Sequence, residues 1–259
     1  MTLSKESTEF LDNLRVYLFA SGKNEQEVDS IVSELEDHLR EAESKGKNIQ
    51  HIIGSSPKEY MEQLAKELDF DYVAAMKYVP MAIIGFLAFV ILGDALRFEI
   101  DYSWFELVGY PVVALLLIAV TMGTFKFLAG RQWKRGKQMA LLTGLGIFNI
   151  GAFLLLIFLS DKFGTPVFVL NQTGQWIVIA ISAILLIGIA ILIKMWLPIV
   201  LPMALYGPEV ILKWSFLQEW LKWDDVMITF VGSLIGYAIL FVYFIVQIRL
   251  LNKKEERSS

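Results

Sequence analysis

The sequence predicts an all-α protein, in which a small polar helical domain is followed by a polytopic helical membrane domain. Apolar residues make up 56% of the 259-residue chain, more than a soluble domain of this length needs for its core. Charge is also unevenly divided: residues 1–78 hold 16 acidic and 9 basic side chains, and residues 79–259 hold 11 and 14. We therefore divide the chain into an acidic helical domain, residues 1–75, and a membrane domain, residues 76–259.

The composition excludes several functional classes. The chain has no cysteine, which excludes disulfides, iron–sulfur clusters, cysteine–zinc sites and thiol catalysis. The acidic N-terminal domain argues against nucleic acid as a direct ligand, because phosphate binding requires clustered lysine and arginine. His38 and His51 are the only histidines, and neither stands in a spacing typical of metal ligands. We expect no metal and no cofactor.

Four helices are predicted in the N-terminal domain, because apolar residues recur there at helical spacing. The first covers residues 5–19. The second begins after Asn24, a helix-capping residue type, and ends near Gly46. After a short turn of helix that ends at Gly54, the last helix begins at Ser56, which is followed by proline in the first helical position.

The second of these helices carries an acidic face. It consists of Glu34, Glu36, Asp37 and Glu41. Dense charge on a surface helix commonly does no more than keep a domain soluble. The alternative is that this face docks a protein partner, and these four residues are our candidate docking site.

Much of the N-terminal domain resembles the HAAS domain, a small helical domain found at the N-terminus of bacterial membrane proteins. The resemblance rests on a leading helix with FLDNL, an acidic helix with ELEDHL, a glycine turn and a closing helix that begins GSSPKEY. It covers residues 8–68 and does not include the membrane part. The family implies a signalling or adaptor module, often encoded beside PadR-type transcriptional regulators, with no catalytic residues.

Five apolar runs are long enough to cross a hydrocarbon core of about 30 Å. They cover residues 79–96, 105–128, 139–159, 175–193 and 226–248. A sixth segment, 196–212, is apolar but contains three prolines, and we expect it to form a short, broken span. Residues 209–225 have the pattern of an amphipathic helix at the membrane interface.

Positive charge predicts the orientation. The first 25 residues lack the apolar core of a secretory signal, so we expect a cytoplasmic N-terminal domain. The resemblance to the HAAS domain implies a protein of the bacterial cell membrane. We count the lysines and arginines from Lys77 onward and leave out Lys126. A topology of six spans places ten of them inside and four outside, whereas a topology of five spans places eight inside and six outside. Six spans with a cytoplasmic C-terminus are therefore preferred. The alternative is five spans, with residues 196–212 re-entrant or on the surface.

Four residues of the membrane domain are candidates for an intramembrane function. Charge within a span is costly and so indicates function. Glu209 shares the sixth segment with Pro202 and Pro208, and interrupted helices line ion or substrate sites in transporters. Asp94 lies near the outer end of the first span, close to Arg97.

The sequence contains no recognisable enzyme signature. The run VGSLIGY has a serine between glycines, but the membrane domain has no histidine to activate it. We expect a non-enzymatic membrane signalling or regulatory protein, whose N-terminal domain docks a cytoplasmic regulator or a subunit of a membrane complex. The alternatives are a small transporter or permease-like subunit, and a membrane assembly factor. Membrane lipid is the other expected partner.

Overall fold

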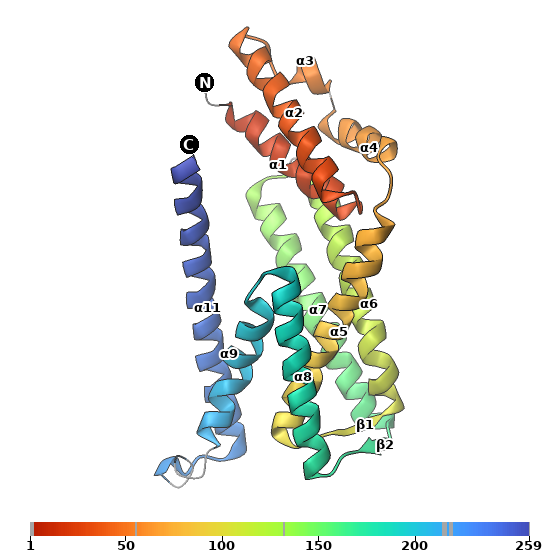
Figure 1. Cartoon of the computed structure of the whole chain (residues 1–259), viewed down its shortest axis with the longest axis vertical. Helices are drawn as coiled ribbons and strands as arrows, with labels where there is room; N and C mark the ends of the chain where they lie inside the picture. The colour runs from red at the N-terminus through yellow and green to blue at the C-terminus, as the bar shows by residue number, and fades with distance from the viewer. Residues whose placement is uncertain (1–2, 55, 132, 214–216, 218–219, 259) are drawn as a thin grey trace. The chain divides into compact units, whose positions relative to one another are not determined.

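The computed structural model describes residues 3–54, 56–131, 133–213, 217 and 220–258 (Figure 1). Within these residues the chain is helical apart from its connections and one two-stranded sheet, so the predicted all-α class is confirmed. The chain forms two compact units. The first unit contains Met1–Pro80 and Phe105–Phe163, and the second contains Met81–Trp104 and Gly164–Ser259.

The first unit holds the N-terminal domain and two long helices. Its helices are α1 (Lys5–Ala20), α2 (Glu25–Ser44), α3 (Gln50–Ile53), α4 (Pro57–Glu67), α6 (Trp104–Ala129) and α7 (Arg135–Phe163). Helix α5 (Tyr72–Arg97) begins in the first unit and continues into the second, with the division after Pro80.

Side-chain caps set the starts of α2 and α4. The side chain of Asn24 accepts hydrogen bonds from the backbone N–H groups of Gln26 and Glu27. The side chain of Ser56 accepts one from the N–H of Glu59. Each cap satisfies donors that the first turn of a helix leaves unpaired. Both predicted helix starts are confirmed.

An apolar core holds α1, α2, α3 and α4 together. Leu14, Leu18, Val28 and Leu39 are its most deeply buried large side chains. The same cluster includes Ala129, the last residue of α6. The N-terminal domain therefore completes its core against the end of a candidate membrane span.

The turn between α1 and α2 is hydrogen-bonded to the connection between α4 and α5. Nζ of Lys23 donates to the carbonyl oxygen of Leu68 over 2.6 Å. The backbone N–H of Asp71 donates to the carbonyl oxygen of Gly22, with an N···O distance of 2.8 Å. We call these two segments, Gly22–Asn24 and Leu68–Asp71, the joint.

Asp71 serves both the joint and the start of α5. One of its carboxylate oxygens accepts from the N–H of Ala74 (2.8 Å), and the other accepts from Nδ2 of Asn24 (2.7 Å). The backbone bond from Ala74 and the side-chain bond from Asn24 hold the pKa of Asp71 below its usual value. The carboxylate therefore stays charged at neutral pH, and the first turn of α5 remains tied to the N-terminal domain.

The second unit contains the rest of α5 together with α8 (Gln172–Ile193), α9 (Leu197–Leu212) and α11 (Asp225–Ser258). Strands β1 (Asp101–Ser103) and β2 (Pro166–Val169) pair antiparallel, with Tyr102 opposite Phe168. The sequence analysis did not predict these strands. Their pairing brings together the connection after α5 and the connection before α8, which agrees with a topology that puts both on one side of the membrane.

Five helices in the described part of the chain are long and apolar enough to cross a membrane. They are α5, α6, α7, α8 and α11 from Asp225 to Gln247, and they match the five predicted runs. Large apolar side chains such as Ile147, Ile150, Ile184 and Phe241 are exposed on them. A surface of this kind is stable against lipid tails but not against water.

Helix α9 is the shorter, sixth apolar helix. Its 16 residues reach about 24 Å, less than a hydrocarbon core of about 30 Å. The helix continues through Pro202 and Pro208, so the break predicted at these prolines is wrong. Both prolines are buried, which favours a segment packed inside the second unit over one on its surface. Of the amphipathic helix predicted over residues 209–225, the first four residues belong to α9. Residues 214–216, 218 and 219 lie outside the described residues.

The turn at Gly22 yields a test of the joint. Gly22 has φ +72°, and a Cβ there would collide with the ring of Phe70. We predict that Gly22→Ala lowers the free energy of unfolding of the N-terminal domain by roughly 1–3 kcal/mol, because backbone strain and the collision add. Pulse proteolysis of the detergent-solubilised chain across a urea series measures this loss.

Gly46 is the matched control for this substitution. Its φ is +73°, but nothing lies within 4 Å of its Cβ position. Gly46→Ala therefore introduces the backbone strain without the collision, and its loss should be smaller. Equal losses in the two variants would show that the ring of Phe70 does not constrain the turn.

Candidate functional site: a charge cluster around Glu209

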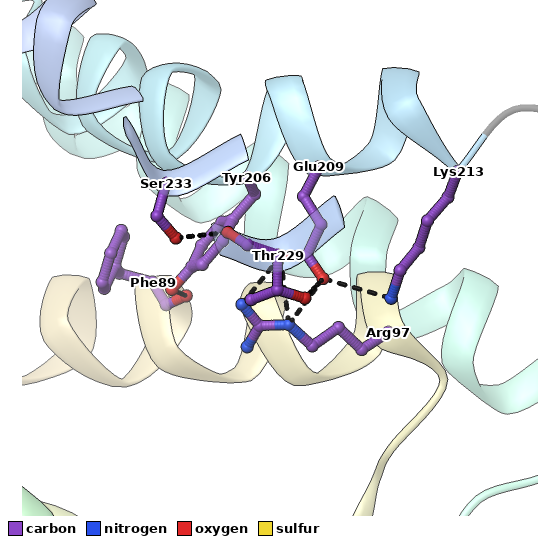
Figure 2. Close-up of polar contacts among 7 residues, drawn as sticks. All are labelled: Phe89, Arg97, Tyr206, Glu209, Lys213, Thr229 and Ser233. Carbon is purple, nitrogen blue, oxygen red and sulfur yellow. Dashed lines mark hydrogen bonds and ion pairs between the residues drawn. The ribbon is translucent and has the colours of Figure 1, made fainter. Parts of the chain in front are cut away.

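A buried carboxylate, that of Glu209, lies where the ends of α5 and α9 meet the beginning of α11 (Figure 2). Only 5% of Glu209 is exposed. The residue stands in the last turn of α9. Arg97, the last residue of α5, and Thr229, near the start of α11, face it from the other two helices.

Two cations share this carboxylate. Nη2 of Arg97 donates to Oε2 over 2.9 Å, and Nε of Arg97 lies 3.2 Å from Oε1 and 3.3 Å from Oε2. Lys213, one turn after Glu209, places Nζ 3.1 Å from Oε1. The hydroxyl of Thr229 donates to Oε1 over 3.4 Å. We call Arg97, Glu209 and Lys213 the charge cluster.

Burial differs sharply across the charge cluster. The side chain of Glu209 is 6% exposed, whereas those of Arg97 and Lys213 are 32% and 34% exposed. A carboxylate enclosed in an apolar segment is stable only when charges and hydrogen bonds compensate its lost hydration. Because both of its oxygens are engaged, the carboxylate serves to hold the three helices together.

Tyr206, one turn before Glu209, extends the contact along α5 (Figure 2). Its hydroxyl donates to the backbone carbonyl of Phe89 over 3.3 Å, and the two rings stack with centroids 5.1 Å apart. The guanidinium of Arg97 lies 5.7 Å from the Tyr206 ring centroid. A Cβ at Gly93 would come within 2.5 Å of that ring. The glycine therefore makes room for the tyrosine between α5 and α9.

Two glycines of α11 bring α9 close. A Cβ at Gly232 would lie 3.1 Å from the backbone of Glu209, and one at Gly236 would lie 2.5 Å from the carbonyl oxygen of Ala204. Two small residues four positions apart are typical of tightly packed membrane helices. The Ala204 carbonyl is also the one that Pro208 leaves without its usual helical donor. The close approach therefore places α11 directly over the irregularity in α9.

The residues predicted for an intramembrane function all lie in the second unit, with different roles. Glu209 is the centre of the charge cluster. Pro202 and Pro208 are buried in α9 and offer no side-chain polar group. Asp94 accepts a hydrogen bond from the hydroxyl of Tyr102 over 2.8 Å, which ties α5 to β1.

The sequence analysis missed both cationic partners of Glu209. Lys213 could have been found, because a lysine four residues after a glutamate on a helix is a favourable pair. Arg97 stands 112 residues away, and no local pattern connects it to Glu209. The spacing of Gly232 and Gly236 could also have indicated a close contact between helices.

The predicted docking residues lie on α2 in the N-terminal domain, and three of the four already have a partner on that helix or at its C-terminal cap. Glu34 pairs with His38 (3.8 Å), Glu36 with Arg40 (2.7 Å) and Glu41 with Lys45. Lys45 holds the pKa of Glu41 below its usual value. Exposed pairs of this kind contribute little to stability, because solvent screens their attraction. Among the described residues, none of the acidic or histidine side chains form a group of three or more able to hold a metal ion.

Residues 89–204 match the family model of the HAAS transmembrane region. The match includes Asp94, Arg97 and Pro202 and ends before Glu209. A search of curated proteins and a search of solved structures found no match. The similarity to this family therefore lies in the membrane region, which the resemblance of residues 8–68 had left out. For the N-terminal domain the HAAS resemblance stays a prediction.

We predict that Glu209→Gln lowers the free energy of unfolding by roughly 1–3 kcal/mol, because it leaves two cations without a counter-charge. Arg97→Met should have a similar effect. The double variant should lose less than the sum, since both changes remove one interaction. Thermal unfolding in detergent measures all three. Glu99→Gln, which alters an exposed carboxylate near Arg97, is the control, and strictly additive losses would contradict the pairing.

Proposed function

We propose that this chain is a non-enzymatic regulatory protein of the bacterial cell membrane. In this proposal the membrane domain responds to the state of the membrane or to a small apolar compound. The N-terminal domain passes that response to a cytoplasmic protein. The similarity of residues 89–204 to the HAAS transmembrane region supports a membrane protein of this general kind.

One observation carries the proposal: a single helix, α5, connects the joint to the charge cluster. Its first residue, Tyr72, directly follows Asp71 of the joint, and its last residue, Arg97, pairs with Glu209. A helix is stiff along its axis, because every turn is hydrogen-bonded to the next. A change in the contacts of Arg97 therefore acts on the same element that the N-terminal domain is tied to.

A proline gives α5 a defined place to bend. Pro80 lies inside the helix, at the division between the two compact units. It cannot donate the backbone hydrogen bond that would join it to Met76, and kinks concentrate at such positions. A bend there would change the direction of α5 without unfolding the helix.

The charge cluster has the physical character of a switch. Its bonds are either made or broken, because a half-separated ion pair keeps the desolvation cost and loses the attraction. Arg97 and Lys213 remain about a third exposed, so a signal at the membrane surface has access to them. Two discrete arrangements of such a contact are what a regulatory protein requires.

Charge supports a cytoplasmic N-terminal domain. The connection between α6 and α7 and the turn that follows hold Arg131, Lys134, Arg135 and Lys137. They belong to the same compact unit as the domain. Basic residues concentrate in cytoplasmic connections. The acidic face of α2 would then meet a partner with a basic surface.

Transport is the second candidate, favoured by the burial of Glu209 within an apolar helix. It is placed second because both carboxylate oxygens are held by the protein itself. A transporter would lose its transport in Glu209→Gln while keeping its partners. A regulatory protein would bind its partners through the N-terminal domain alone.

The direct test neutralises the acidic face without changing its shape. The variant carries Glu34→Gln, Glu36→Gln, Asp37→Asn and Glu41→Gln. Its control neutralises four other exposed carboxylates of the same domain, through Glu25→Gln, Glu27→Gln, Glu67→Gln and Asp69→Asn. Each protein is purified from native membranes in mild detergent, and the proteins retained with it are quantified.

We expect the unaltered chain and the control to retain the same soluble protein, and the acidic-face variant to lose it. The reason is that the partner's cations would no longer find the carboxylates of the acidic face. Retention of an identical set by all three proteins would refute docking through this face.

A further inference from the structure

A cleft of about 960 Å³ lies in the first unit, between the N-terminal domain and the connection from α6 to α7. One wall comes from α1 and the start of α4. The other comes from the end of α6, the connection itself and the first turn of α7. Because α6 and α7 are candidate membrane spans, the cleft lies where those helices leave the membrane.

The wall next to the spans is basic. Arg131, Lys134 and Arg135 line it, and within the described ranges none of the three has a carboxylate partner. The guanidinium of Arg131 lies 4.3 Å from the ring centroid of Phe127 and 5.6 Å from that of Trp133. These aromatic contacts hold one cation at the level of the membrane interface, where tryptophan is favoured.

The wall that α1 provides carries the opposite charge. Glu6, Glu9 and Asp12 line it, with Lys5 placed 3.7 Å from Glu9. The start of α4 adds Lys58, which pairs with Glu62 at 3.1 Å. The cleft is therefore bipolar, with cations beside the spans and carboxylates on the N-terminal domain. The tendency of basic residues to lie in cytoplasmic connections accounts for the first wall but not for the second.

We propose that this cleft binds the headgroup of a phospholipid that carries both a phosphate and an amine, as phosphatidylethanolamine does. In such a lipid the phosphate is bonded to the glycerol that carries the acyl chains, and the ammonium lies farther out. The phosphate then meets Arg131, Lys134 and Arg135, and the ammonium meets the carboxylates of α1. Charge-assisted hydrogen bonds to phosphate are among the strongest that arginine and lysine make.

The carboxylates of the α1 wall are the reason why the headgroup must carry an amine. A headgroup with negative charge alone would meet the basic wall equally well, but it would leave the carboxylates of Glu6, Glu9 and Asp12 facing a like charge. The bound lipid would join the N-terminal domain to the membrane surface in addition to its covalent link through α5. This site does not depend on the regulatory role proposed above.

The test measures lipid retention by the full chain in detergent, using native mass spectrometry. Three lipids with the same acyl chains are added: phosphatidylethanolamine, phosphatidylglycerol and phosphatidylcholine. The basic-wall variant carries Arg131→Gln, Lys134→Gln and Arg135→Gln. The acidic-wall variant carries Glu9→Gln and Asp12→Asn. Lys137→Gln and Glu25→Gln are the controls, since neither residue lines the cleft.

We expect the unaltered chain and both controls to retain phosphatidylethanolamine over phosphatidylglycerol by about tenfold, the ratio that one additional charged hydrogen bond supplies. The basic-wall variant should lose both lipids. The acidic-wall variant should keep phosphatidylglycerol and lose the preference, a change of selectivity that only a folded protein can show. Phosphatidylcholine, whose quaternary ammonium cannot donate a hydrogen bond, should bind less than phosphatidylethanolamine.

Two outcomes would overturn the proposal. Equal retention of phosphatidylethanolamine and phosphatidylglycerol by the unaltered chain would remove the role of the α1 carboxylates. Undiminished retention of phosphatidylethanolamine by the basic-wall variant would show that the lipid binds elsewhere.

Discussion

The carboxylate of Glu209 is the group on which the packing of the second unit depends. A charge in an apolar segment cannot remain unpaired, so the sequence that places it there must also deliver its partners. Lys213 comes from the same helix, but Arg97 comes from α5, and the hydroxyl of Thr229 comes from α11. Satisfying one carboxylate therefore fixes the ends of three helices relative to one another.

The other features of this region follow from that requirement. Arg97 can reach Glu209 only if α5 and α9 approach closely, and Gly93 provides the space that the ring of Tyr206 needs. Thr229 can reach it only if α11 does the same, and Gly232 removes the side chain that would stand in the way. The close packing compensates for the irregularity that Pro208 introduces in α9, which explains why the helix continues through a residue that usually breaks helices.

At the other end of α5, the contacts are hydrogen bonds and not a buried ion pair. Asp71 caps the helix and accepts a bond from Asn24, and the carbonyl of Gly22 receives the N–H of Asp71. These contacts are exposed or only partly buried and individually modest, but they share residues, so loss of one weakens the others. The helix thus ends in a buried, charged contact and begins at a polar, less buried one.

Local patterns predicted much of this fold, and non-local contacts account for what they missed. The caps at Asn24 and Ser56 and the five long spans depend on residues close in sequence, and all were predicted. The pair of Arg97 with Glu209 depends on two segments that meet only in the folded chain. The short strands around Tyr102 and Phe168 likewise form by pairing with each other, since neither has the length or the alternation that marks a strand in sequence. Glu209 itself was predicted because an acidic residue within an apolar run can be recognised from the local sequence, without knowing its partner.

Hydrogen exchange at the joint tests most directly whether α5 couples the charge cluster to the N-terminal domain. The peptide that contains Asp71 would be followed in the full chain, in unaltered form and as Glu209→Gln, with Glu99→Gln as the control. The account predicts faster exchange at this peptide in Glu209→Gln alone, while the peptide around Leu39 in the core of the domain stays unchanged. Unaltered exchange at the joint in a chain whose charge cluster is broken would contradict the coupling.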